Sequence, residues 1–87
     1  MPIAIDVGNT NAVLGIIKDN IIVEQLRIKT ESLKIPLNDI SDETRNELSK
    51  LVNGESRNIL LSGVVPQAML NLKLLIEEMY ENKKIIL

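Results

Sequence analysis

The sequence contains no cysteine and no histidine. The absence of cysteine excludes a disulfide framework and a thiolate metal site, and it is typical of a protein from a reducing compartment. The absence of histidine excludes histidine acid-base catalysis, Ser-His triads and His-ligated zinc. Any chemistry would therefore rely on carboxylates, hydroxyls, lysine, tyrosine and backbone amides.

Aromatic residues, excess positive charge and long apolar runs are also lacking. One tyrosine, no Phe and no Trp leave little for nucleic-acid bases to stack on, and the formal net charge of -2 disfavours a phosphate-backbone binder. No apolar run approaches the roughly 20 residues that cross a bilayer, and the opening MPIAID lacks the basic region of a signal peptide. We expect a cytoplasmic protein with no nucleic-acid partner and no membrane partner.

The length allows one small domain. A chain of 87 residues, 45% of them hydrophobic, would bury only about 60 to 65% of its unfolded surface. We expect a single domain over residues 1–87 that is marginally stable unless it finds a partner, either a second copy or another lobe.

The first third of the chain predicts three strands. They cover residues 2–7, 12–18 and 21–29, and turn residues separate them. Because the connections are short, the strands should form an antiparallel meander, with the first strand at the centre of the sheet. Gly15, inside the second strand, predicts a bulge or a close backbone approach.

A loop and a helix follow the meander. Residues 30–38 contain Pro36 and show no period, which indicates a loop. Asn38, Asp39 or Ser41 can cap the helix, and Asn53-Gly54 would end it. Its partly apolar stripe comprises Ile40, Thr44, Leu48, Leu51 and Val52.

The last third predicts strand, helix and strand. Residues 58–65 form a fourth strand, a second helix begins at Pro66 and continues to Glu81, and residues 84–87 start a fifth strand. The order is therefore β-β-β-α-β-α-β. A mixed five-stranded sheet of the ribonuclease H-like α/β class satisfies the antiparallel opening and the parallel crossovers, and a ferredoxin-like sandwich stays open on element order alone.

The stretch AIDVGNTN at the end of the first strand carries polar residues that suit a phosphate and a metal ion. Asp6 is a carboxylate of the kind that Mg²⁺ prefers. Gly8 can adopt a positive φ and present successive N–H groups to an anion, and Asn9, Thr10 and Asn11 add side-chain donors at the same tip. No G-x-x-x-x-G-K motif is present.

The alternative for this stretch is an ordinary hairpin turn, because Asn, Gly and Thr are common turn residues. Asp6 favours the phosphate site, since an acid within an apolar strand is costly to bury without a partner or a metal. On the residues alone, the two interpretations are about equal. Ser62, Arg27 and Lys29 are interpreted mainly as strand-end or solvated residues, with a role at phosphate as the alternative.

Three segments together resemble type III pantothenate kinases, in the superfamily of acetate and sugar kinases, Hsp70 and actin. Residues 6–11, DVGNTN, resemble the first phosphate loop of that family. Residues 62–66, SGVVP, are similar to its Ser-Ser-Val-Val-Pro segment, with Gly63 in place of the second serine. Residues 25–30, QLRIKT, are similar to the end of its third strand, Trp-Arg-Ile-Ser-Thr.

The resemblance implies phosphorylation of pantothenate by ATP, with Mg²⁺ and a monovalent cation (K⁺ or NH₄⁺), as the first step of coenzyme A biosynthesis. It implies that Asp6 handles metal and phosphate and is the catalytic residue of this stretch, and that Gly8, Asn9, Thr10 and Asn11 bind the ATP phosphates. It also implies that the chain corresponds to the N-terminal lobe of the family's fold.

The Gly-Ala-Asp-Arg segment that holds the family's presumed base is not found in these 87 residues, and neither is its second phosphate loop. We therefore expect the chain to be inactive alone. Two other interpretations stay open: a non-catalytic interaction or pseudo-kinase module of the same fold, and an unrelated small α+β domain in which DVGNT is only a turn.

Overall fold

The computed structural model describes residues 2–52, 58–79 and 84–86. Along the chain, these residues form the strands β1 (Ile3–Val7), β2 (Asn11–Lys18) and β3 (Ile21–Lys29), the 3-10 helices η1 (Thr30–Leu33) and η2 (Leu37–Asp39), the helix α1 (Asp42–Val52), the strand β4 (Asn58–Gly63), the helix α2 (Pro66–Met79) and the strand β5 (Lys84–Ile86).

The five strands form one mixed sheet in the order β3-β2-β1-β4-β5, with β1 at its centre. The pairs β1–β2 and β2–β3 are antiparallel, whereas β1–β4 and β4–β5 are parallel. The predicted mixed sheet, with a meander followed by parallel crossovers, is therefore confirmed. The order of the strands excludes the ferredoxin-like alternative.

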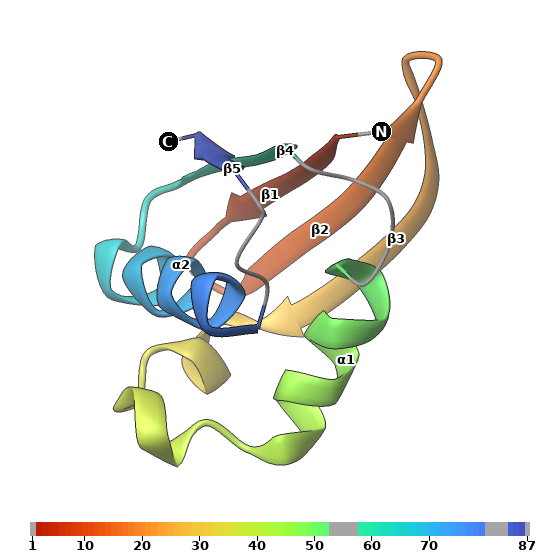
Figure 1. Cartoon of the computed structure of the whole chain (residues 1–87). Helices are drawn as coiled ribbons and strands as arrows, with labels where there is room; N and C mark the ends of the chain where they lie inside the picture. Colours follow the sequence, from red (N-terminus) through yellow and green to blue (C-terminus); the bar gives the residue numbers. More distant parts are fainter. Residues whose placement is uncertain (1, 53–57, 80–83, 87) are drawn as a thin grey trace.

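Both helices cover the same face of the sheet (Figure 1). The connections from β3 to β4 and from β4 to β5 step across the sheet in the same direction. Because such parallel crossovers are almost always right-handed, both place their helices on one side. Within the described residues, no helix covers the other face, which we call the open face.

Burial along β1 alternates accordingly. Ile3, Ile5 and Val7 are buried beneath the helices, whereas Ala4 is half-buried and Asp6 is exposed on the open face. The core lies between the covered face and the helices. Its buried apolar residues are Ile3, Ile5, Val7, Ala12, Leu14, Ile28, Leu33, Ile40, Leu48, Leu51, Val52, Ile59, Leu61, Ala68, Leu72, Leu75 and Ile76. Of the stripe predicted for the first helix, Ile40, Leu48, Leu51 and Val52 belong to this core, and Thr44 is buried as well.

The prediction of a loop over residues 30–38 is wrong in part, because η1 and the start of η2 lie within this range. A buried amide of α2 holds it: Asn71 Nδ2 donates to the carbonyls of Leu33 at 2.7 Å and of Ile35 at 2.8 Å. The segment has no period of its own, and a side chain 36 or more residues away satisfies its backbone. Local sequence patterns do not contain that information.

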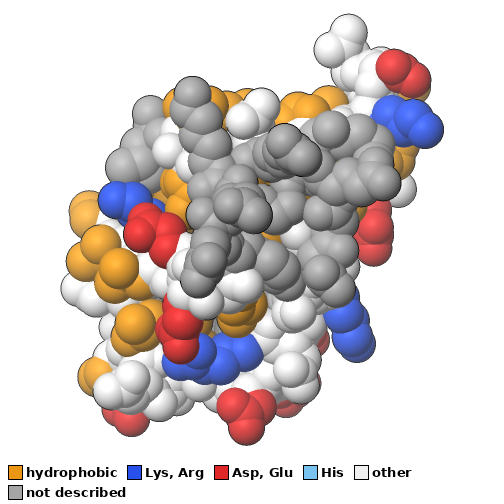
Figure 2. Space-filling view, viewed as in Figure 1, with side chains coloured by type: hydrophobic (Ala, Val, Ile, Leu, Met, Phe, Trp, Pro, Cys, Tyr) orange, Lys and Arg blue, Asp and Glu red, His pale blue; other side chains and the backbone are white. Residues whose placement is uncertain are grey.

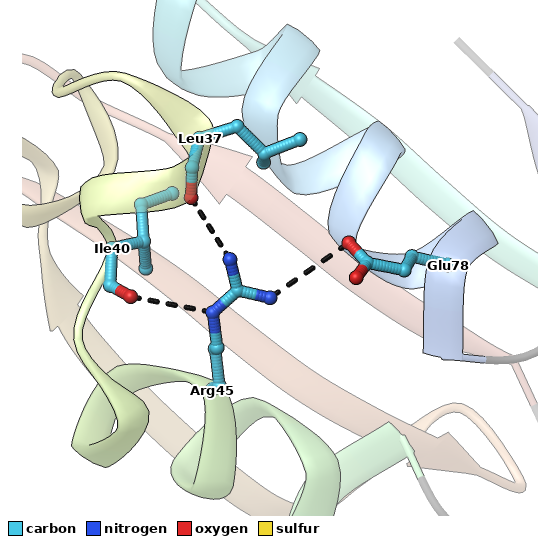
Figure 3. A network of polar contacts seen from close by, with 4 residues as sticks. All are labelled: Leu37, Ile40, Arg45 and Glu78. Atoms are coloured by element: carbon cyan, nitrogen blue, oxygen red, sulfur yellow. Dashed lines mark hydrogen bonds and ion pairs between the residues drawn. The ribbon is translucent and has the colours of Figure 1, made fainter.

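Arg45 of α1 holds the second half of the same segment (Figure 3). Its guanidinium donates to the carbonyl of Leu37 at 2.9 Å and to that of Ile40 at 3.3 Å. It also forms an ion pair of 3.7 Å with Glu78 of α2, whose side chain is largely exposed. Since exposed ion pairs contribute at most about 1 kcal/mol, the carbonyl contacts carry most of this connection.

The element boundaries differ slightly from the prediction. Ser41 is the helix cap among the three candidates, because its Oγ accepts from the Thr44 N–H at 3.2 Å. The fourth strand ends at Gly63, before Val65. The predicted ends at residues 53–54, at Glu81 and at Leu87 lie outside the described residues.

The β2–β3 hairpin projects beyond the rest of the sheet (Figure 1). Asp19 and Asn20 form its turn with φ of 53° and 65°, and the register shifts between Ile16 and Ile17. Gly15 lies beside this irregularity, and an added Cβ there would be 3.3 Å from the Ile22 side chain. The backbone atom nearest to that Cβ, the Glu24 carbonyl oxygen, is at an ordinary 3.7 Å, so the close backbone approach expected at Gly15 is not found. The alternative expectation, a bulge, is matched by the register shift next to Gly15.

Charged side chains of both signs are scattered over the helix-covered side, and apolar side chains are exposed along its edge (Figure 2).

Among the described helices, none has the length and hydrophobicity required to span a membrane.

We predict that Asn71→Ala lowers the free energy of unfolding by about 2 kcal/mol or more, because two carbonyls held by the buried amide lose their donor. Urea unfolding followed by circular dichroism measures this change. Asn46→Ala, at an exposed position of α1, is the matched control and should change stability by less than about 0.5 kcal/mol. Equal effects of the two substitutions would contradict the assigned role of Asn71.

Candidate functional site

Asp6 lies on the open face, near the carboxyl end of the central strand. Its neighbours across the sheet are Val13 of β2 and Ser62 of β4. All three line a depression of about 450 Å³ whose other walls are mostly apolar. The carboxylate is therefore accessible at one end of an otherwise apolar surface.

The expectation that Asp6 is a buried acid in need of a partner is wrong. The side chain alternates to the open face and is exposed. The sequence of β1 is mostly apolar on both faces, which concealed that only one face is covered. Asp6 therefore carries no cost of burial, and its candidacy as a ligand depends on its position at the end of β1.

The hairpin tip after β1 is closed by a backbone hydrogen bond that the sequence did not predict. The Gly8 N–H donates to the Asn11 carbonyl at 2.9 Å, so this amide is used within the hairpin. Gly8 does not have the positive φ that was expected, since Gly63 is the glycine with one among the described residues. An added Cβ at Gly8 would be in tight contact with the backbone, 3.3 Å from the Asn11 carbonyl oxygen.

Asn11 belongs to β2, not to the tip, and it pairs with Lys29 of β3. Asn9 and Thr10 thus form the exposed tip. A second depression, of about 350 Å³, brings these three polar residues together with Lys29 and Glu31. Asp6 does not line this depression, although Asn11 and Asp6 lie on the same face of the sheet by alternation along the paired strands.

Thr30 connects the tip to the body of the protein. It is fully buried, its Oγ1 donates to the Gly8 carbonyl at 2.7 Å, and its N–H donates to the Thr10 carbonyl at 3.0 Å. In the sequence, Thr30 stands out only as the last residue of the family-like segment QLRIKT. The bond to Gly8 spans 22 residues of sequence and the bond to Thr10 spans 20, so no local pattern predicts them.

The SGVVP segment closes over the end of β1. The Val64 N–H donates to the Val7 carbonyl at 2.9 Å. Gly63 has a φ of 153°, and a Cβ there would lie 2.4 Å from the Val7 carbonyl oxygen. Ser62 is exposed beside Asp6, and its Oγ is 3.5 Å from the Ile5 carbonyl oxygen. The two sequence motifs, far apart in the chain, thus meet at one end of the sheet.

Oxygen atoms dominate what this end of the sheet offers a ligand. The Asp6 carboxylate, the Ser62 hydroxyl and the Asn11 amide lie on the open face. Within residues 2–52, 58–79 and 84–86, no group of three or more acidic, His or Cys residues is arranged to hold a metal ion. A cation at Asp6 would therefore take most of its ligands from water or from a bound anion.

A mixed sheet in this order, with both crossovers on one face and a tight hairpin at the end of its central strand, places the chain in the class of ribonuclease H-like lobes found in actin and Hsp70. The family model for type III pantothenate kinase matches residues 2–87. The chain belongs to the type III pantothenate kinase family.

A curated relative gives the same result. A type III pantothenate kinase from Bacillus cytotoxicus is 29% identical over 92 residues, which cover 99% of this chain and 33% of the relative. The chain thus spans about a third of the length of the relative it matches.

We predict that Gly63→Ala destabilises the protein by about 2 kcal/mol or more, because the methyl group would overlap the backbone of β1. Gly15→Ala is the matched control. Its Cβ would be close only to the movable Ile22 side chain, at 3.3 Å, and at an ordinary 3.7 Å from the Glu24 carbonyl oxygen, so its effect should stay below about 1 kcal/mol. Urea unfolding of both variants tests this, and a Gly63→Ala variant as stable as Gly15→Ala would refute the close approach.

Proposed function

We propose that this chain is the lobe of a type III pantothenate kinase that binds the phosphates of ATP through Asp6, Gly8, Asn9, Thr10 and Asn11. The observation that carries this proposal is the accessible carboxylate of Asp6 beside a hairpin tip whose backbone Thr30 holds in place. A longer protein containing this lobe would transfer a phosphoryl group from ATP to pantothenate, as the first step of coenzyme A biosynthesis. We place such a protein in the cytoplasm.

The residues present fit a Mg²⁺ ion. This cation usually binds to one or two carboxylates and completes its shell with water and phosphate oxygens. Asp6 is an exposed carboxylate of this kind, and it would be both the metal ligand and the catalytic residue of the lobe. Bound there, Mg²⁺ would supply charge neutralisation at the phosphates.

The charges around the tip support phosphate binding only in part. Lys29 lines the same depression as Asn9 and Thr10 and would attract a phosphate, whereas Glu31 would repel it. The monovalent cation implied by the family stays a prediction without assigned residues.

We also propose that residues 1–87 act as one domain and have no kinase activity alone. Phosphoryl transfer requires groups that position the acceptor and the nucleotide, and the depression around Asp6 offers one carboxylate on an open surface.

Asp6→Asn should weaken the binding of Mg-ATP about tenfold or more, which corresponds to about 1.4 kcal/mol, because the carboxamide keeps the shape and loses the charge that holds the cation. Isothermal titration calorimetry with ATP, in the presence of MgCl₂ or of EDTA, measures the effect. Asp19→Asn is the matched control: it removes the same charge from the far hairpin turn, where asparagine tolerates the positive φ. No heat at millimolar Mg-ATP, or equal affinities of the two variants, would exclude the site.

A second candidate function is a non-catalytic interaction module, and the open face favours a second copy of this chain as its partner. On this face, Asp6 and Arg27 lie one strand to either side of Val13 in the same row. If two open faces pack about a two-fold axis along β2, each Asp6 lies opposite the Arg27 of the other copy. Apolar surface beside this row would be buried in the contact.

Size-exclusion chromatography with light scattering tests self-association. The wild-type chain should have the mass of a dimer, Arg27→Glu should be monomeric, and the double variant Asp6→Lys, Arg27→Glu should restore the dimer by exchanging the charges. Lys50→Glu, on exposed α1 surface, is the control for the charge change and should remain dimeric. A monomeric wild-type chain at high concentration would eliminate this candidate.

A further inference from the structure

We propose that Thr30 is a positioning residue that orients the backbone amides of the hairpin tip toward a bound phosphate. This inference depends on the proposed phosphate site and extends it to a residue with no direct contact to the ligand. Thr30 is the first residue of η1, directly after β3, and it is fully buried.

Thr30 holds two carbonyl groups on its own side of the tip. The hydroxyl donates to the Gly8 carbonyl at 2.7 Å, and the N–H donates to the Thr10 carbonyl at 3.0 Å. The bond to the Gly8 carbonyl is short, and breaking it would leave the buried Thr30 hydroxyl without a partner. It therefore orients the Gly8 carbonyl strongly.

Peptide planarity converts these contacts into a direction for the next amides. In a trans peptide, the carbonyl of one residue and the N–H of the next point in opposite directions, and the described residues contain no cis peptide. The Asn9 N–H therefore points away from Thr30 because the Gly8 carbonyl points toward it. Likewise, the Asn11 N–H points away from Thr30 because the Thr10 carbonyl points toward it.

These two amides, with the Thr10 N–H between them, follow Gly8 at the hairpin tip and the start of β2. The Gly8 N–H is used by the Asn11 carbonyl. If either peptide plane rotated, a carbonyl oxygen with partial negative charge would face the anion in place of an N–H donor. Thr30 thus stabilises the donor-outward state, which a phosphate binds, against a state that repels it.

The position of Thr30 also links the tip to the core. Asn71 holds the segment that begins at Thr30, because its amide donates to the carbonyls of Leu33 and Ile35. The hydroxyl therefore acts from a fixed base, which is what precise orientation of a loop requires.

The experiment compares the full chain with Thr30→Val, which keeps the branched shape and removes the hydroxyl. Calorimetry should show Mg-ATP binding about tenfold weaker for Thr30→Val and within about threefold of wild type for Thr30→Ser, which retains the donor. Thr44→Val is the matched control, since Thr44 is also buried and its hydroxyl accepts from the Oγ of Ser41, the residue that caps α1. It should lower the melting temperature and leave ATP affinity unchanged.

A second measurement without nucleotide separates this inference from the proposed function. NMR order parameters of the Asn9 and Asn11 amides should fall in Thr30→Val and stay at the wild-type value in Thr30→Ser and Thr44→Val. If Thr30→Val does not fold, Thr30→Ala, which leaves a small cavity, replaces it.

The possible outcomes are distinct. If the wild-type chain does not bind Mg-ATP but Thr30→Val loosens both amides, the proposed phosphate site fails and only the structural contact with the tip stands. If the wild-type chain binds Mg-ATP and Thr30→Val binds it equally well, or Thr44→Val weakens it as much, the positioning role of Thr30 is wrong.

Discussion

The direction of the two parallel crossovers is the constraint on which the rest of this structure depends. Both steps, from β3 to β4 and from β4 to β5, proceed the same way across the sheet. Right-handed connections therefore place α1 and α2 on one face, and that face becomes the core. A consequence follows for β1 at the centre: Ile5 is buried and Asp6, the next residue, is exposed on the open face. The accessibility of the carboxylate results from topology.

The irregular segment between β3 and α1 is the second organising feature. It has little regular structure of its own and is held by polar side chains of the helices, chiefly Asn71 and Arg45, through backbone carbonyls. At its start, the Thr30 hydroxyl donates to the Gly8 carbonyl at the hairpin tip. The two helices are therefore connected to the candidate phosphate site through hydrogen bonds, although neither contributes a side chain to the tip.

Much of the fold could be predicted from the sequence, since the strands are short β-branched runs and the helices carry apolar stripes with capping residues. The mixed sheet follows from such patterns, whereas the sequence left three candidate caps for α1 and the structure selects Ser41. The candidate site was predictable at the level of the motif, because DVGNTN and SGVVP resemble segments of one family and the family is confirmed. The roles of Asp6, Gly8, Asn9, Thr10 and Asn11 stay predictions, and the conformation expected at Gly8 is wrong because its N–H closes the hairpin on Asn11.

By itself, the sequence determined the succession of elements, the apolar positions of the core and membership of the family, because these depend on local periodicity and on short motifs. Only the tertiary structure decided that one face of the sheet is open, that Asp6 lies on it, and that Thr30 and Gly63 both contact the backbone at the carboxyl end of β1. Those features depend on contacts between residues more than 20 positions apart. Such contacts exist only after the chain has folded, and they therefore leave no local pattern in the sequence.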